Sequence, residues 1–180
     1  MRNLVLLPEA LVVAMAVLVM LSGRFGWIPS ASSRYLPQAT ALVVLIALGV
    51  ELWAGATLTT FFGGALVQDR FSLFAKAAAL LTAAVALAAT DWTAEDSLHL
   101  GLAMPLLASF GIMVAASAAD LVGLWAGLEL AAAAGVVLVS LRRPDLGLRL
   151  LVVGGVASTL IVVGLVSPDL LVEVEAVAAK

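Results

Sequence analysis

The residues with the clearest chemical potential in this sequence are two glutamates that interrupt long apolar runs. Glu129 lies near the middle of the fifth such run, and Glu51 lies about two-thirds along the second. A charged side chain at the centre of a membrane helix costs about 2.5–3.5 kcal/mol on insertion scales, which makes each one a functional candidate. Because burial disfavours the charged form of a carboxyl, either residue could take up and release a proton near neutral pH. The competing structural interpretation, that the carboxyl is simply neutral or is satisfied by a neighbouring helix, is favoured for Glu51 but not for Glu129.

Two basic residues are candidates for the same proton chemistry. Arg149 lies near the start of the sixth apolar run, and Lys76 lies about one turn into the third. Since a guanidinium does not lose its proton in proteins, Arg149 could stabilise an ionised Glu129 but could not pass a proton on. At 1.5 Å per residue, Glu129 lies roughly 18 Å below the turn at Arg142, so a direct ion pair with the shallower Arg149 is not expected. Snorkelling toward the headgroups is the competing explanation for Arg149, and snorkelling or helix packing is the favoured one for Lys76.

A pair of glycines precedes Glu129. Gly123 and Gly127 form a small-xxx-small pair, a spacing that lets a neighbouring helix approach closely in lipid. Helix packing alone is the favoured interpretation of the pair. A tight contact at this point would also keep the carboxyl of Glu129 away from lipid.

No motif for substrate chemistry accompanies these residues. The sequence has no phosphate-binding glycine loop, no nucleophile elbow, no HExxH and no dinucleotide fingerprint. The absence of cysteine excludes disulfides, thiolate-held iron–sulfur clusters and cysteine zinc sites, and a single histidine argues against a His-rich metal or haem site. We therefore expect no catalytic site, metal or bound cofactor in this chain itself. A net charge of −3 argues against a nucleic-acid partner.

The composition indicates that these residues are positioned by membrane helices. Of the 180 residues, 64% are hydrophobic and 12% are charged, whereas soluble domains hold roughly 45–50% apolar and 25% charged residues. The mean hydropathy is +1.19. A transmembrane helix needs about 20 mainly apolar residues. Six segments approach that length, and we predict an all-α, polytopic membrane protein whose residues 1–166 form a six-helix bundle. The predicted spans lie near residues 4–21, 36–58, 71–89, 98–116, 121–141 and 148–166.

The breaks between the spans carry turn and capping residues, such as Gly63-Gly64 and the helix-start pattern Thr93-x-x-Asp96. The first apolar run resembles a signal peptide, but Glu9 interrupts it and no clear cleavage site follows, so we expect a retained helix in which the role of Glu9 is open. Residues 167–180 form a short tail that could lie in the interface. Lys and Arg collect on cytoplasmic loops, and their distribution modestly favours both termini outside. The two sets compared are Arg24, Arg34, Arg142, Arg143 and Arg149 against Arg2, Arg70, Lys76 and Lys180.

Four stretches of the chain resemble the N subunit of proton-pumping NADH:quinone oxidoreductase (respiratory complex I), one of its antiporter-like membrane subunits. They are residues 6–9, 69–76, 111–130 and 149–158. The third is the most specific, because its residue types and its spacing from Asp120 to Glu129 are both similar to the family's. The resemblance implies that Glu129 corresponds to the proton-channel glutamate on the fifth helix. Arg149 falls where the family usually has a lysine, which puts proton relay at that point in question.

The resemblance also implies a setting. Electron transport through NADH, FMN, iron–sulfur clusters and quinone is expected elsewhere in the complex, with other membrane-arm subunits and the lipid of a bacterial plasma membrane as partners. Family members have about fourteen helices, so only the first six are expected here. Three functions remain open: a shortened N-type translocase subunit with at most a half-channel through Glu129, a scaffold in the same complex, and an independent small membrane transporter.

Overall fold

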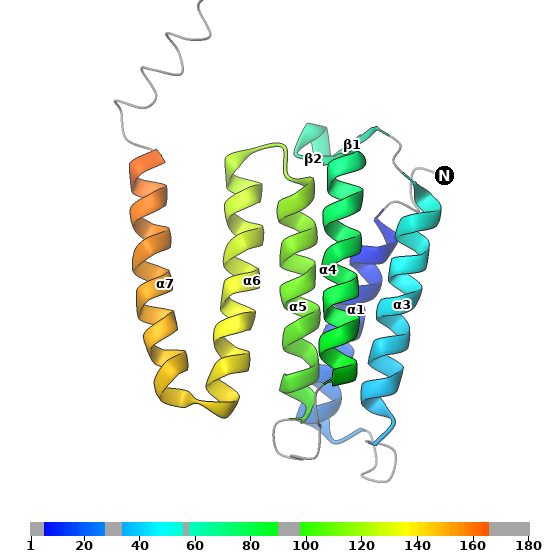
Figure 1. Ribbon diagram of the computed structural model, residues 1–180, viewed down its shortest axis with the longest axis vertical. Helices are drawn as coiled ribbons and strands as arrows, with labels where there is room; N and C mark the ends of the chain where they lie inside the picture. The colour runs from blue at the N-terminus through cyan, green and yellow to red at the C-terminus, as the bar shows by residue number, and fades with distance from the viewer. Residues whose placement is uncertain (1–5, 28–33, 56–57, 90–97, 166–180) are drawn as a thin grey trace, which may run out of the picture.

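The structure, a computed structural model, describes residues 6–27, 34–55, 58–89 and 98–165 (Figure 1). Long helices make up most of the described chain, and a short two-stranded hairpin lies at one end of them. The helices are α1 (Leu7–Phe25), α3 (Leu36–Ala54), α4 (Arg70–Ala89), α5 (Leu98–Ser117), α6 (Leu121–Arg142) and α7 (Pro144–Leu165).

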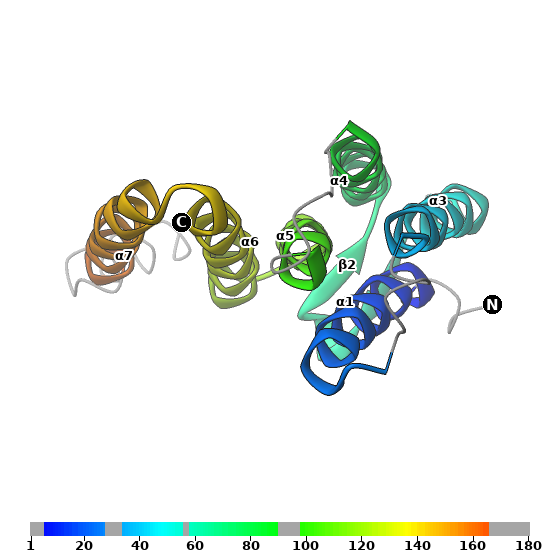
Figure 2. The same ribbon diagram turned by 90° about the horizontal axis from the view of Figure 1, so that it is seen from below.

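Four of the helices form a ring. The order around the ring is α1, α3, α4 and α5, and each of these helices contacts the two beside it (Figure 2). Outside the ring, α6 packs on α5 and α7 packs on α6. The buried apolar core lies inside the ring and includes Val12, Ala16, Val44, Leu80, Leu102, Leu106 and Met113. The ring is therefore the part of the molecule in which a polar side chain is removed from both water and lipid.

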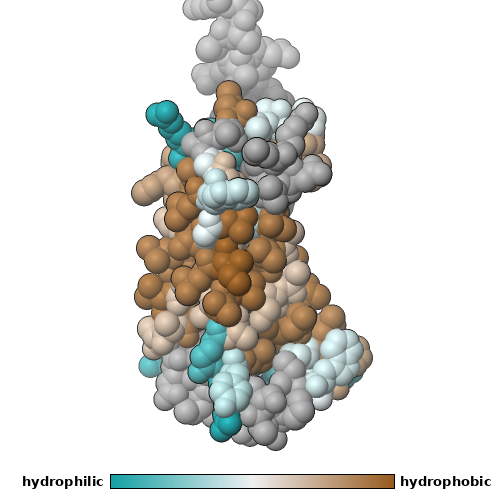
Figure 3. Space-filling model, turned by 90° about the vertical axis from the view of Figure 1, so that its right-hand side faces the viewer, coloured by the Kyte–Doolittle hydropathy of each residue, from teal (hydrophilic) through white to brown (hydrophobic). Residues whose placement is uncertain are grey.

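The outer surface of the bundle is apolar. Figure 3 shows a band of hydrophobic side chains around the middle of one face, with polar residues gathered toward both ends. Large apolar side chains stand exposed on the helices, including Leu42, Leu45, Leu81, Val85, Leu151 and Val153. Five helices, α1, α3, α4, α5 and α6, are long and apolar enough to cross a membrane, and α7 holds the sixth predicted span. The prediction of an all-α, polytopic membrane protein is confirmed.

Among the described residues, three helix ends differ from the predicted spans by four residues. The first helix, α1, continues to Phe25, whereas its predicted span ended at residue 21. The second span was expected to reach residue 58, but α3 ends at Ala54 because Gly55 adopts a positive φ of 70°. The last helix begins at Pro144 rather than at residue 148, since the fixed φ of proline suits the first turn of a helix. Residues 1–5, the predicted helix start at Thr93 and the tail 167–180 lie outside the described residues.

The segment around Gly63-Gly64 is a hairpin rather than a simple turn. Strand β1 (Thr59–Phe61) pairs antiparallel with β2 (Leu66–Gln68) across a single 3₁₀ turn, η2 (Phe62–Gly64), in which all three residues have positive φ. The hairpin is attached to the α5–α6 connection, where the backbone N–H of Ala119 donates to the carbonyl of Ala65 at 2.9 Å. Hydropathy alone gave no indication of these strands, because each is only three residues long.

Small residues allow α5 and α6 to pack with their backbones almost touching. A methyl group placed on Gly111 would lie 2.6 Å from the carbonyl oxygen of Gly127 and 2.7 Å from the nitrogen of Ala131. A methyl group on Gly127 would in turn lie 2.6 Å from the nitrogen of Ala115. Each helix thus contributes a small-xxx-small pair to the contact.

Gly123, expected to share this contact, has a different environment. A methyl group there would meet the side chains of Asp120 at 3.1 Å and Ala118 at 3.3 Å, both close by in the chain. The backbone N–H of Gly123 donates to Oδ1 of Asp120 at 2.6 Å, which caps the start of α6. Gly123 therefore belongs to the helix cap, and Gly127 to the contact between helices.

We expect Gly111→Ala to destabilise the protein by about 1–3 kcal/mol, because the new methyl group would meet backbone atoms that cannot rotate away. The measurement is chemical unfolding of the purified full-length chain in lipid nanodiscs. Gly135→Ala is the matched control, since a methyl group on Gly135 meets nothing within 4 Å. Equal stability of the two variants would contradict the close helix contact.

Candidate functional site

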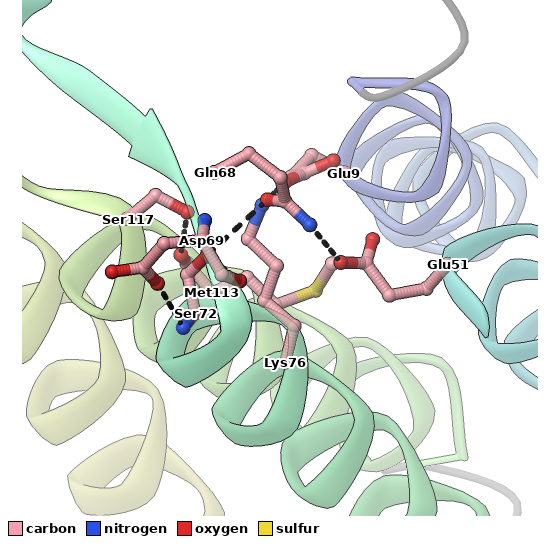
Figure 4. Close-up of polar contacts among 8 residues, drawn as sticks. All are labelled: Glu9, Glu51, Gln68, Asp69, Ser72, Lys76, Met113 and Ser117. Atoms are coloured by element: carbon pink, nitrogen blue, oxygen red, sulfur yellow. Dashed lines mark hydrogen bonds and ion pairs between the residues drawn. The ribbon is translucent and has the colours of Figure 1, made fainter. Parts of the chain in front are cut away.

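Four polar side chains meet inside the helical ring near the hairpin. They are Glu9 of α1, Glu51 of α3, Gln68 of β2 and Lys76 of α4, named here the Lys76 cluster (Figure 4). The ammonium of Lys76 forms an ion pair with Oε1 of Glu9 at 2.5 Å and donates to Oε1 of Gln68 at 2.6 Å. The amide nitrogen of Gln68 donates to Oε1 of Glu51 at 2.8 Å. Gln68 thus bridges the lysine to the second carboxyl.

The cluster is removed from solvent. Lys76 and Gln68 are each 1% exposed, Glu51 is fully buried, and the side chain of Glu9 is 11% exposed. One oxygen on each acid, Oε2 of Glu9 and Oε2 of Glu51, is buried and has no hydrogen-bond partner in the part of the chain that the structure describes. Buried polar atoms are nearly always hydrogen-bonded, so these two oxygens mark places where a proton or a water molecule can be accommodated.

The start of α4 positions Lys76. Oδ1 of Asp69 accepts from the backbone N–H of Ser72 at 2.7 Å, and the backbone N–H of Asp69 donates to Oγ of Ser72 at 2.8 Å. These reciprocal bonds form a capping box that fixes the first turn. The bond from the Ser72 backbone lowers the pKa of Asp69 below its ordinary value. Lys76 follows Ser72 by four residues and therefore lies on the same face of α4.

The structure brings together two of the residues predicted from the sequence and leaves two apart. Glu51 and Lys76 meet in the cluster, and Glu9, whose role was open, joins them. Lys76 does not snorkel, because its ammonium is held inside the ring by Glu9 and Gln68.

Glu129 lies outside the ring, half-buried on α6. It is two residues, or about 200°, from Gly127 and so lies on the opposite face from the α5 contact. Val136 and Ser140 follow Glu129 by seven and eleven residues and share its face, and a methyl group on Gly147 of α7 would clash with Ser140. Glu129 is thus on the side of α6 toward α7, and the glycine contact does not shield it. Among the described residues, the side chain of Glu129 has no hydrogen bond or ion pair.

Arg149 is exposed near the start of α7, two turns from the connection to α6. The described contacts include no ion pair between Arg149 and Glu129, in agreement with their expected difference in depth.

Gln68 and Ser72 were missed by the sequence reasoning. Gln68 falls in the predicted connection between the second and third spans, where polar residues are ordinary, and Ser72 is the second residue of the predicted third span, where a lone serine is also ordinary. The available signal was the four-residue spacing of Ser72 and Lys76, which places both on one face at the start of α4; Gln68 precedes that helix, in β2. That spacing does not identify their partners on α1 and α3.

We expect Lys76→Met to destabilise the protein by about 3–5 kcal/mol, because removal of the ammonium leaves the buried carboxyl of Glu9 without its ion-pair partner. Unfolding of the full-length chain in nanodiscs measures the loss. Arg70→Met is the matched control, since Arg70 is an exposed base at the start of the same helix. Recovery of part of the stability in Lys76→Met combined with Glu9→Gln would support the charge argument, and a Lys76→Met protein as stable as the control would contradict it.

Comparison of the sequence with known proteins finds relatives along most of the chain. No protein-family model matches the chain. A curated protein of Azorhizobium caulinodans, NADH-quinone oxidoreductase subunit N, is 34% identical over 167 residues, which cover 88% of this chain and 34% of that protein. The subunit N of Rhodobacter capsulatus is 33% identical over the same shares, and that of Magnetococcus marinus is 28% identical over 91% of this chain and 36% of its own length.

The chain spans about a third of the length of these relatives. The similarity nevertheless extends over nearly all of its own residues and recurs among several bacterial proteins of the same name. The resemblance predicted from the sequence is confirmed: this membrane protein is homologous, over 88% of its length, to NADH-quinone oxidoreductase subunit N.

Proposed function

We propose that the chain serves as an N-type, antiporter-like membrane-arm subunit of a proton-translocating NADH:quinone oxidoreductase, contributing at most a half-channel for protons through Glu129. The observation that carries this proposal is the position of an acidic side chain within a membrane-spanning helix of a chain homologous to subunit N. Its position on the α7 side of α6, without a hydrogen bond or ion pair among the described residues, leaves its carboxyl available to exchange a proton. Arg149, near the start of α7, would act through its fixed positive charge alone.

In this proposal the redox chemistry belongs to other chains of the assembly. NADH, FMN, iron–sulfur clusters and quinone are handled elsewhere, and the chain lies in the bacterial plasma membrane with both termini on the outer side. Its partners are the other membrane-arm subunits and lipid. The described residues contain no group of three or more His, Cys, Asp and Glu that could hold a metal ion.

A scaffold function in the same assembly is the second candidate. Arg149 favours it, because an arginine cannot deliver a proton where the resembling family usually has a lysine. The exposed apolar side chains of α7, Leu148, Leu150, Leu151, Val152 and Val153, are compatible with burial against other membrane helices. An independent small transporter is the third candidate, and the two measurements below separate these functions.

We expect Glu129→Gln to lower proton pumping by the assembled complex severalfold while leaving assembly intact, because the amide keeps the shape of the side chain and cannot bind or release a proton. Proton uptake into sealed membrane vesicles, driven by NADH oxidation, is the measurement. Asp145→Asn is the matched control, since Asp145 is an exposed acid in the first turn of α7. Unchanged pumping by a normally assembled Glu129→Gln complex would favour the scaffold.

We also expect the full-length chain to copurify with other membrane-arm subunits in mild detergent, because α7 packs on α6 and leaves large apolar side chains exposed on its other faces. Mass spectrometry of the purified material identifies the subunits. A stable, monodisperse 18.4 kDa species that transports ions alone would instead favour the independent transporter.

A further inference from the structure

We propose that the Lys76 cluster is a second proton-binding site, separate from Glu129, in which the carboxyl of Glu51 takes up and releases one proton at the hairpin end of the ring. Lys76 supplies the positive charge that faces the two carboxyls, and Gln68 positions Lys76 and Glu51. The proposal does not depend on assembly of the chain into an oxidoreductase.

The charges of the cluster do not balance when all of its groups are ionised. Glu9 and Glu51 would contribute two negative charges and Lys76 one positive charge, a sum of −1 in a region that is at most 11% exposed. An uncompensated buried charge is costly, whereas a neutral, hydrogen-bonded group is much less so. One added proton brings the cluster to neutrality.

The contacts select the carboxyl that receives this proton. Glu9 forms the ion pair with Lys76 at 2.5 Å, so its negative charge is directly compensated. Glu51 reaches Lys76 only through the amide of Gln68, with bonds of 2.8 Å and 2.6 Å. The charge of Glu51 is therefore the less stabilised of the two, because attraction falls with separation.

Glu51 also has an oxygen on which a proton fits. Its Oε1 accepts from Gln68, while its Oε2 is buried without a partner among the described residues. In the proposed step, a hydronium ion from the water at the hairpin end breaks one of its O–H bonds and gives the proton to Oε2, which forms a carboxylic acid and leaves a water molecule; the reverse step returns the proton to water. The Gln68 amide donates to Oε1 in both states, so it keeps its place and carries no proton itself.

The site is close to the hairpin end of the membrane helices. Glu51 lies three residues before the end of α3, and Lys76 lies six residues after the start of α4, which correspond to roughly 4.5 and 9 Å of helix rise. Glu9 lies in the first turn of α1 at the same end. A proton therefore has one to two helical turns to cross between the water at that end and the cluster.

The neighbouring groups leave Glu51 as the titrating member. On α4 and just before it, Ser72 is neutral and Asp69 is engaged in the helix cap. On α5, Met113 and Ser117 are uncharged, and the Ser117 hydroxyl donates to the Met113 carbonyl at 3.1 Å (Figure 4). No other charged group from these elements faces the cluster among the described residues.

Infrared difference spectroscopy of the full-length chain in lipid nanodiscs tests the proposal. Spectra are recorded as the pH is lowered, in a Glu129→Gln background so that Glu129 does not contribute. We expect a protonated-carboxyl band that exchanges with heavy water and is lost in Glu51→Gln, whose amide side chain still accepts from Gln68. Asp145→Asn, which removes an exposed acid, is the control and should leave this band in place.

Glu9→Gln provides a second readout that a purely structural contact would not change. With Glu9 neutral, an ionised Glu51 alone balances Lys76, so the Glu51 band should be lost although Glu51 is still present. The helix amide bands of the same spectra report whether each variant is folded, and Glu9→Gln carries the test if Glu51→Gln does not fold. A folded Glu51→Gln protein that loses no carboxyl band, or a folded Glu9→Gln protein that keeps the Glu51 band unchanged, would overturn the proposal.

Discussion

Burial of the Lys76 ammonium is the constraint on which the helical ring depends. An ammonium group removed from both water and lipid must be compensated at contact distance, since its isolated burial would cost several kcal/mol. The ring meets this requirement with one acceptor from α1 and one from the hairpin, while α3 is joined through Gln68. The ion pair therefore fixes the relative heights of α1 and α4 at one end of the bundle, where apolar packing alone would allow the helices to slide.

The contrast between Lys76 and Glu129 follows from where each residue lies. Inside the ring, polar atoms are surrounded by a closely packed apolar core that offers them no water, so the charged groups there bind one another. On α6, the half-buried carboxyl of Glu129 can be contacted by α7, by water or by another chain. The carboxyls inside the ring thus belong to a buried hydrogen-bond network, whereas the carboxyl of Glu129 does not, which is why the two sites are proposed to act separately.

The sequence was sufficient to predict the membrane helices and to single out some of the polar site residues, for different reasons. Hydropathy predicts membrane helices because lipid requires about 20 apolar residues in each, and any charge within such a run, as with Glu51, is conspicuous. The meeting of Glu51 with Glu9 and Lys76 depends on the order of helices around the ring, which hydropathy does not encode. Gln68 depends on a hairpin of three-residue strands, which gives no periodic signal. By contrast, helical geometry already places Glu129 about 200° from Gly127, so the unshielded face was accessible to reasoning from spacing.

The hairpin connects the two proposed proton sites through short covalent and hydrogen-bonded steps. Its strand β2 carries Gln68 into the Lys76 cluster, and Leu66 of the same strand forms a bridge with Ala118 in the α5–α6 connection. Asp120, two residues further on, caps α6, the helix that carries Glu129. Because the amide of Gln68 must lie between Lys76 and Glu51, the position of β2 is fixed, and with it the start of α6. The bonds that hold the buried lysine therefore also set the height of Glu129 relative to the ring.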